Sequence, residues 1–148
     1  VQYVELALWL GKQGLAPSFV FGPAELERGL DREIAGLTAN RFATHSPRDF
    51  TELTNLLLTA RAVAGNDCGP MHLAGLLGVP GAVLFGPTSR KQWKPLGLVP
   101  VTTDTPCRPC TRTTANIPCT EPRCILEIEM KAVQQALGSI LPQPGAKP

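Results

Sequence analysis

Residues 62–88 read AVAGNDCGPMHLAGLLGVPGAVLFGPT, and this stretch decides the fold of the chain. The short apolar run 62–65 predicts a strand, and a polar turn separates it from a helix that starts at Pro70. Proline suits the first helical position because its fixed φ fits the helix and its missing N–H has no partner there. Gly78 is placed to end the helix, and residues 82–85 predict the next strand. Strand, helix and strand this close together indicate a parallel pair with a right-handed crossover.

The rest of the chain continues the alternation of helices and strands. We expect helices over 1–13, 24–35, 49–59 and 125–141, strands over 18–21, 40–44 and 99–102, and a basic loop over 89–95. Apolar spacing places Leu8 and Phe50 inward, and it makes Leu73, Leu76 and Leu77 the buried stripe of the central helix. This alternation predicts an α/β fold built on a doubly wound parallel sheet.

The turn between the first predicted strand and the central helix has the features of a phosphate site. A helix start presents unpaired N–H groups and a partial positive charge. Gly69 lets a ligand approach the backbone closely, and His72 lies in the first turn, within reach of an anion. Ligands of open α/β sheets bind beyond the carboxyl ends of the strands, where this turn is expected. The alternative is an ordinary helix start, capped by Asp67 or Gly69, with His72 solvated.

Three motifs are similar, in order and spacing, to the C-terminal half of glycosyltransferase family 9, the lipopolysaccharide heptosyltransferases that use ADP-heptose. They are NDCGPMHLA at 66–74, LGVP at 77–80 and LFGPT at 84–88. The resemblance extends more weakly over residues 1–141. It implies a Rossmann-like sheet that forms the donor-binding half of a GT-B enzyme. Cys68 stands where the family usually has Thr or Ser, a change that a backbone contact tolerates and a hydroxyl contact does not.

The resemblance implies that this half of the enzyme binds the nucleotide-sugar donor. Asp67 is expected to fix sugar hydroxyls or the turn itself, while amides from Cys68 to Met71 hold phosphate oxygens beside His72. For Glu25 two roles stay open, which are contact with the ribose or base and stabilisation of a helix start through the dipole. The substrate-binding residues expected are Gly22, Glu25, Asp67, Cys68, Gly69, Pro70, Met71, His72 and Thr88.

The reaction that the resemblance implies is inverting transfer of heptose from ADP-heptose to the lipopolysaccharide inner core. The transfer needs a base for the acceptor hydroxyl and stabilisation of the leaving diphosphate. The family's base is an aspartate of the N-terminal half, so we expect no catalytic residue, no metal at the donor site and no required cofactor in this chain. Alone, the chain is expected to be inactive. Two alternatives stay open: another GT-B nucleotide-sugar enzyme, or a nucleotide-binding fragment without catalysis.

Composition limits the class of protein. With 148 residues, 43% hydrophobic and 18% charged, the chain has the composition of a globular domain. A net charge of +2 without a long basic run argues against a nucleic-acid partner. No apolar run reaches the roughly 18 residues of a membrane span, and no signal-peptide pattern opens the chain. The resemblance implies a location in the cytoplasm, with peripheral contact of the full-length protein at the inner face of the inner membrane.

The expected organisation is a single nucleotide-sugar-binding domain over residues 1–141. It contains a cysteine-rich loop at 107–124 and a terminal helix at 125–141, and a disordered tail follows at 142–148. Because the sequence begins with Val1 instead of Met, and already within an apolar helix-like run, we expect it to be cut from a longer chain. The alternative is a processed or a small protein. The expected partners are a small nucleotide sugar and, through the absent N-terminal half, the lipopolysaccharide acceptor.

Four cysteines lie within 18 residues, at 107, 110, 119 and 124. Thiolates at such density are able to hold tetrahedral zinc, although the eight- and four-residue gaps match no standard zinc ribbon. Disulfides are not favoured in a reducing cytosol. Many relatives of the family carry a cysteine-rich loop at this place. A structural zinc site and free thiols therefore both stay open. Nearby, Arg90, Lys91 and Lys94 either face the diphosphate or form a solvated loop.

Overall fold

A computed structural model describes residues 2–110 and 119–141 of the chain. Within those ranges it is a mixed α/β structure with five short strands, and every strand pairing is parallel. The prediction of an α/β fold with parallel strands is therefore confirmed. The described chain divides into two compact units, residues 2–53 and the described part of 54–141, and each holds one sheet.

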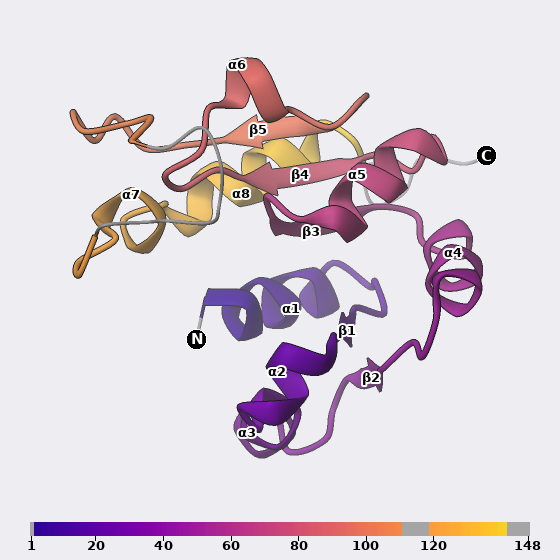
Figure 1. Ribbon diagram of the computed structural model, residues 1–148. Helices are drawn as coiled ribbons and strands as arrows, with labels where there is room; N and C mark the ends of the chain where they lie inside the picture. The colour runs from indigo at the N-terminus through magenta and orange to yellow at the C-terminus, as the bar shows by residue number, and fades with distance from the viewer. Residues whose placement is uncertain (1, 111–118, 142–148) are drawn as a thin grey trace. The chain divides into compact units, whose positions relative to one another are not determined.

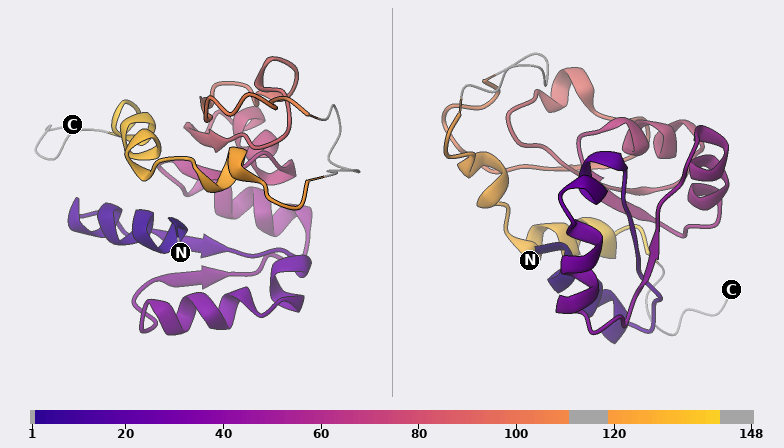
Figure 2. Two further views of the ribbon diagram at one scale, coloured as in Figure 1. Left: turned by 90° about the vertical axis from the view of Figure 1, so that its left-hand side faces the viewer. Right: turned by 60° about the horizontal axis from the view of Figure 1, so that its bottom comes forward.

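The first unit contains a two-stranded parallel sheet. Strand β1 pairs with β2 along its whole length, with Ser18 beside Ala43, and Figure 2 shows the two arrows pointing the same way. Helices α2 and α3 lie between the two strands in the chain. The elements are α1 (Gln2–Lys12), β1 (Ser18–Val20), α2 (Pro23–Glu27), α3 (Leu30–Leu37) and β2 (Ala43–His45); α4 (Phe50–Leu58) starts here and crosses into the second unit.

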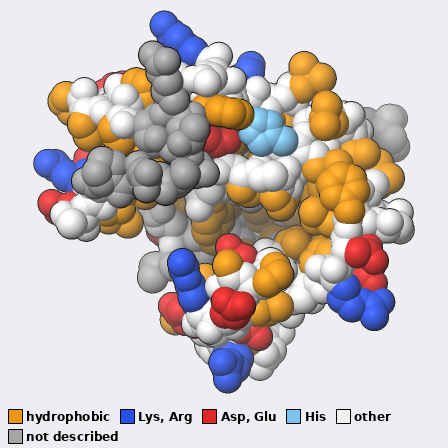
Figure 3. Space-filling model, viewed as in Figure 1, with side chains coloured by type: hydrophobic (Ala, Val, Ile, Leu, Met, Phe, Trp, Pro, Cys, Tyr) orange, Lys and Arg blue, Asp and Glu red, His pale blue; other side chains and the backbone are white. Residues whose placement is uncertain are grey.

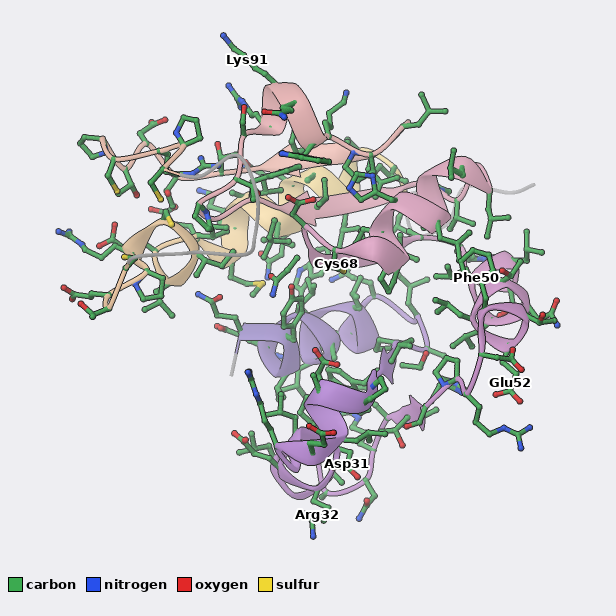
Figure 4. All side chains as sticks on the ribbon, viewed as in Figure 1. Asp31, Arg32, Phe50, Glu52, Cys68 and Lys91 are labelled. Carbon is green, nitrogen blue, oxygen red and sulfur yellow. The ribbon has the colours of Figure 1, made fainter. Side chains whose placement is uncertain are left out.

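Three predictions about these elements are wrong. The helix expected over 24–35 is two helices, because Gly29 has a left-handed φ of 69° that breaks the helical path. In α1 the buried residues are Val4, Leu6 and Ala7, whereas Leu8 is exposed. Phe50, expected inward, is 69% exposed at the start of α4 (Figure 4). A cap does form at that start, because Asp49 Oδ1 accepts a 2.8 Å hydrogen bond from Glu52 N–H.

The second unit is built on a three-stranded parallel sheet in the order β3-β4-β5. Helix α5 packs on β3, and α8 packs on β4 and β5, behind which it lies in Figure 1. All four residues of β4 are buried, which is typical of a central parallel strand. The elements are β3 (Val63–Asn66), α5 (Gly69–Leu76), β4 (Gly81–Leu84), α6 (Arg90–Trp93), β5 (Val99–Val101), α7 (Arg123–Leu126) and α8 (Met130–Gly138).

Close backbone contacts hold this sheet and its helix together. A Cβ on Gly81 would lie 2.3 Å from Val63 O, and a Cβ on Gly75 would lie 2.5 Å from Leu96 O. Both positions therefore need glycine for space. Gly78 has a φ of +74° at the end of α5, as the sequence predicts. The core of this unit contains Met71, Val83, Phe85 and Leu98, with Val63 packed against it.

The structure also corrects predictions in this unit. Leu76 is 76% exposed, because α5 turns its Gly75 side toward Leu96; its buried residues are Met71, Leu73, Ala74 and Gly75. The expected basic loop contains the short helix α6. The expected terminal helix is two helices, α7 and α8. The predicted tail at 142–148 lies outside the described residues.

The surface of the described chain is mixed in character. Apolar side chains reach solvent in both units, and the orange atoms of Figure 3 show them on one face. Within the described ranges, no helix has the length and apolar character needed to cross a bilayer.

Candidate functional site

The structure has a turn between β3 and α5, as the sequence predicts, but the helix begins one residue earlier than expected. Cys68 has an extended backbone, with φ −157° and ψ 166°, and is the N-cap of α5. Helical geometry therefore begins at Gly69, and Pro70 occupies the second helical position instead of the first. Figure 4 shows Cys68 where β3 passes into α5. The strand, turn and helix start together place residues 67–72 at the carboxyl edge of the sheet.

Asp67 joins this turn to the turn that follows β4. Its Oδ2 atom accepts a 2.6 Å hydrogen bond from the Thr88 hydroxyl, and its N–H donates to Leu84 O at 3.0 Å. Thr88 is buried, with an exposed fraction of 4%. The parallel register, which pairs Asn66 with Leu84, brings the two turns side by side. Two predicted site residues, Asp67 and Thr88, are thus in direct contact.

His72 stands on the other side of the same carboxylate. Its Nε2 atom lies 3.4 Å from Asp67 Oδ1, and the two side chains are 40% and 12% exposed, respectively. The pair is an ion pair when the imidazole is protonated. Asp67 therefore holds the Thr88 hydroxyl with one oxygen and faces His72 with the other. This arrangement leaves the imidazole accessible at the start of α5, where an anion is favoured.

The amide groups at the start of α5 are not all available to a ligand. Pro70 has no N–H, and the N–H groups of Met71 and His72 both approach Cys68 O, at 3.1 and 3.3 Å. Fewer N–H groups between Cys68 and Met71 are therefore available to a ligand than the sequence predicts. The side chain of Met71 belongs to the core.

Gly69 is the open position in this turn. No described atom lies within 4 Å of the place where a Cβ would stand on it, apart from its immediate neighbours. Its φ is not in the left-handed region, so its backbone shape does not require glycine. Among the described residues, no backbone carbonyl accepts a hydrogen bond from the Gly69 N–H. The absence of a side chain thus leaves a path to the backbone of the helix start.

Gly22 and Glu25 lie in the first unit, at the start of α2. Glu25 Oε2 accepts a 3.0 Å hydrogen bond from Gly22 N–H, which is half of a capping box. The helix-start role for Glu25 therefore has a specific contact behind it. Its contact with a ribose or base stays a prediction. The other seven predicted site residues lie in the second unit, between Asp67 and Thr88.

Arg108 is a residue that the sequence did not single out. Its guanidinium donates to Gly86 O at 2.6 Å and to Thr103 O at 3.1 Å, and its Nη2 lies 3.5 Å from Thr88 O. Cys110 N–H adds a 3.0 Å bond to Pro87 O. These bonds fasten the segment 107–110 to the turn after β4. The available signal was an arginine between two prolines in a cysteine-rich segment, which does not indicate its acceptors.

The basic residues that sequence reasoning considered for the diphosphate are exposed. Arg90, Lys91 and Lys94 all lie at the surface, and Lys91 extends away from α6 in Figure 4. Within the described ranges, none of the three forms an ion pair with an acidic side chain. The solvated alternative is the one that these positions support.

A family model described as glycosyltransferase family 9 (heptosyltransferase) matches residues 1–120. A crystal structure described as a glycosyl transferase family 9 protein from Veillonella parvula matches with a TM-score of 0.75 and 19% sequence identity. The match covers 94% of this chain and 40% of that one, so the chain spans well under half of that protein's length. Among curated proteins none matches. The family model covers most of the sequence, and the chain therefore belongs to glycosyltransferase family 9.

Proposed function

We propose that this chain is the donor-binding part of a glycosyltransferase and that the turns around Asp67 and Thr88 bind the diphosphate and sugar of a nucleotide-sugar donor. The observation that carries the proposal is the Asp67 carboxylate, which is held between the Thr88 hydroxyl and the His72 imidazole. It lies at the carboxyl ends of two neighbouring parallel strands, beside the open backbone of Gly69. Membership of the family supports glycosyl transfer as the reaction.

The proposed role of these groups is to stabilise the leaving diphosphate. The acceptor oxygen forms a bond to the anomeric carbon, the bond from that carbon to the diphosphate breaks, and its electron pair passes to the phosphate oxygen. The His72 imidazole and the Gly69 N–H both face that developing charge. Each hydrogen bond to a charged oxygen contributes about 1.5–3 kcal/mol, so loss of one weakens binding by roughly tenfold or more.

Asp67 has a positioning role in this scheme. Its Oδ1 atom lies 3.4 Å from His72 Nε2 and fixes the direction of the ring. Its second oxygen is already engaged by Thr88. Sugar hydroxyls that reach the turn would meet the remaining exposed edge of the same carboxylate.

The finer proposal is that the donor is ADP-heptose and the acceptor is the lipopolysaccharide inner core. The motifs at 66–74, 77–80 and 84–88, together with the heptosyltransferase description of the matching family, support it. The base that takes the acceptor proton is proposed to lie in a segment beyond this chain. No cofactor is required in this scheme.

Isothermal titration of the chain with ADP tests the site. We expect His72→Ala to weaken binding by about tenfold or more, since it removes a hydrogen bond to a charged phosphate oxygen. Lys91→Ala is the matched control, because it removes one positive charge from the surface at a side chain that extends away from α6. Equal affinity of the wild type and His72→Ala would remove His72 from the site.

Comparison of donors tests the finer proposal. ADP-heptose is expected to bind more tightly than ADP-glucose, because heptose has one more hydroxyl-bearing carbon than glucose and that hydroxyl adds a contact beside Asp67. Equal affinity for the two donors would favour another nucleotide-sugar enzyme of the same architecture. Glycosyl transfer by the 148-residue chain alone would contradict the placement of the base outside it.

A further inference from the structure

Four cysteines of the second unit line one cavity. Cys107, Cys110, Cys119 and Cys124 all face a space of about 260 Å³, in company with prolines. Cys124 is buried and the other three are exposed. Burial, followed by the nearby Cys110 thiol, raises the pKa of the Cys124 thiol, while Arg108 lowers it. Cysteines at both ends of the segment that begins at 107 and ends at 124 are therefore neighbours.

The frame of this cavity is fixed by hydrogen bonds to the sheet. Arg108 and Cys110 bond to the carbonyls of Gly86 and Pro87, at 2.6 and 3.0 Å. At Cys124, which also lines the cavity, the carbonyl oxygen accepts a 3.1 Å hydrogen bond from the Thr103 hydroxyl. Cys110 and Cys124 thus make one of these hydrogen bonds themselves, and Cys107 is next to Arg108, which makes another. The cavity is held at the end of β4 by groups that are not cysteine side chains.

The proposed donor site uses none of these thiols. It involves the turn at Asp67 and the start of α5, and the fifth cysteine, Cys68, belongs to that turn. Four cysteines around one small space need another explanation. Zinc prefers four thiolates in a tetrahedral arrangement at structural sites.

We propose that Cys107, Cys110, Cys119 and Cys124 bind one Zn²⁺ ion as a structural site. Binding balances as Zn²⁺ plus four thiols giving a tetrathiolate complex and four released protons, with no change of oxidation state. In the arrangement of the described residues, no group of three cysteine, histidine or acidic side chains is already placed to hold a metal. The ion therefore draws the four sulfur atoms inward across the cavity, to about 2.3 Å from itself.

The inward movement falls mainly on Cys119. Cys107, Cys110 and Cys124 have anchored backbones close by, so their side chains turn without a change of fold. Among the described residues, none of the sheet makes a backbone hydrogen bond with Cys119. Cys119 is thus the ligand that closes the site, and its substitution separates a four-thiolate site from a three-thiolate one.

Counting reactive thiols tests the proposal on the reduced, metal-free chain. All five cysteines are expected to be alkylated without metal. After addition of one equivalent of Zn²⁺, only Cys68 is expected to react, as intact-mass measurement reports. In Cys68→Ser, no reactive thiol should remain with zinc, whereas uptake of the metal stays unchanged. Addition of Co²⁺ should give the visible absorption of a tetrahedral thiolate complex, displaced by Zn²⁺.

The variant Cys119→Ser completes the test. It is expected to weaken zinc binding by more than about tenfold. Removing an outer-shell partner of a metal ligand already lowers metal affinity by about 10–100-fold, and removing a ligand itself costs more. Full alkylation in the presence of zinc, or unchanged zinc affinity in Cys119→Ser, would overturn the proposal. So would a chain that takes up no zinc after reduction and whose mass before reduction shows two disulfides. The cobalt spectrum of the wild type makes the test independent of how any variant folds.

Discussion

The Thr88 hydroxyl donates a 2.6 Å hydrogen bond to Asp67 Oδ2 across 21 residues of chain. This bond ties the turn after β3 to the turn after β4, and Thr88 is almost fully buried where it forms. The opposite oxygen of Asp67 faces His72. The position of the imidazole at the start of α5 therefore depends on a bond that the imidazole does not make.

Thr88→Val is expected to destabilise the chain. Valine has nearly the same shape but leaves Asp67 Oδ2 without its donor in a partly buried place, which costs about 1–3 kcal/mol. Urea denaturation measures the change. Thr88→Ser, which keeps the hydroxyl, should recover most of the loss. If Thr88→Val were as stable as the wild type, the bond would have no energetic role.

Gly69→Ala is expected to separate binding from stability. A Cβ at this position would meet no atom within 4 Å, and alanine favours the helix by roughly 0.5–1 kcal/mol. Stability should therefore stay level or rise slightly, while ADP affinity falls because the methyl group fills the path to the helix start. Paired thermal melts and titrations check both. A variant that binds ADP like the wild type would exclude Gly69 from the path.

Gly75→Ala is expected to behave in the opposite way. Its Cβ would lie 2.5 Å from Leu96 O and 3.1 Å from Leu96 N, so the backbone itself has to move. Overpacking of this kind costs about 1–3 kcal/mol or more. Gly69→Ala is the matched control, since it places the same methyl group on the same helix. Equal stability of the two variants would show that α5 is free to shift.

Arg108→Met is expected to release the segment 107–110 from the sheet end. The substitution removes donors to Gly86 O and Thr103 O while keeping an extended apolar side chain. Hydrogen exchange of the Cys110 amide, which bonds to Pro87 O, reports the release directly. A rise of roughly tenfold or more corresponds to loss of one charged hydrogen bond. Arg90→Met at the exposed start of α6 should leave that exchange rate unchanged.

Local signals explain what the sequence predicted well. The strand at 63–66, the helix start near Gly69 and the strand at 81–84 each depend on neighbouring residues, namely an apolar run, a turn and a helix-ending glycine. Gly78 has the positive φ that its place after the helix implies. Fold class and the location of the turn were thus accessible from the sequence.

Contacts between distant residues explain what it did not predict. The spacing of leucines predicts a buried Leu76, but the side of α5 that faces inward is decided by the close approach of Gly75 to Leu96, 21 residues later. The bond between Asp67 and Thr88 depends on the register of β3 against β4. The acceptors of Arg108 are backbone carbonyls, which every residue has, so no residue pattern identifies them.

The turn from Gly86 to Thr88 makes hydrogen bonds to two other segments of the chain. Its carbonyls at Gly86 and Pro87 hold the segment 107–110, and its hydroxyl at Thr88 holds Asp67. Three consecutive residues thus connect the segment 107–110 and the turn at Asp67 to the end of β4. A relative with a different segment at 107–110 therefore needs other hydrogen-bond donors for the Gly86 and Pro87 carbonyls. Without them, the turn that positions Thr88 beside Asp67 is no longer held in place.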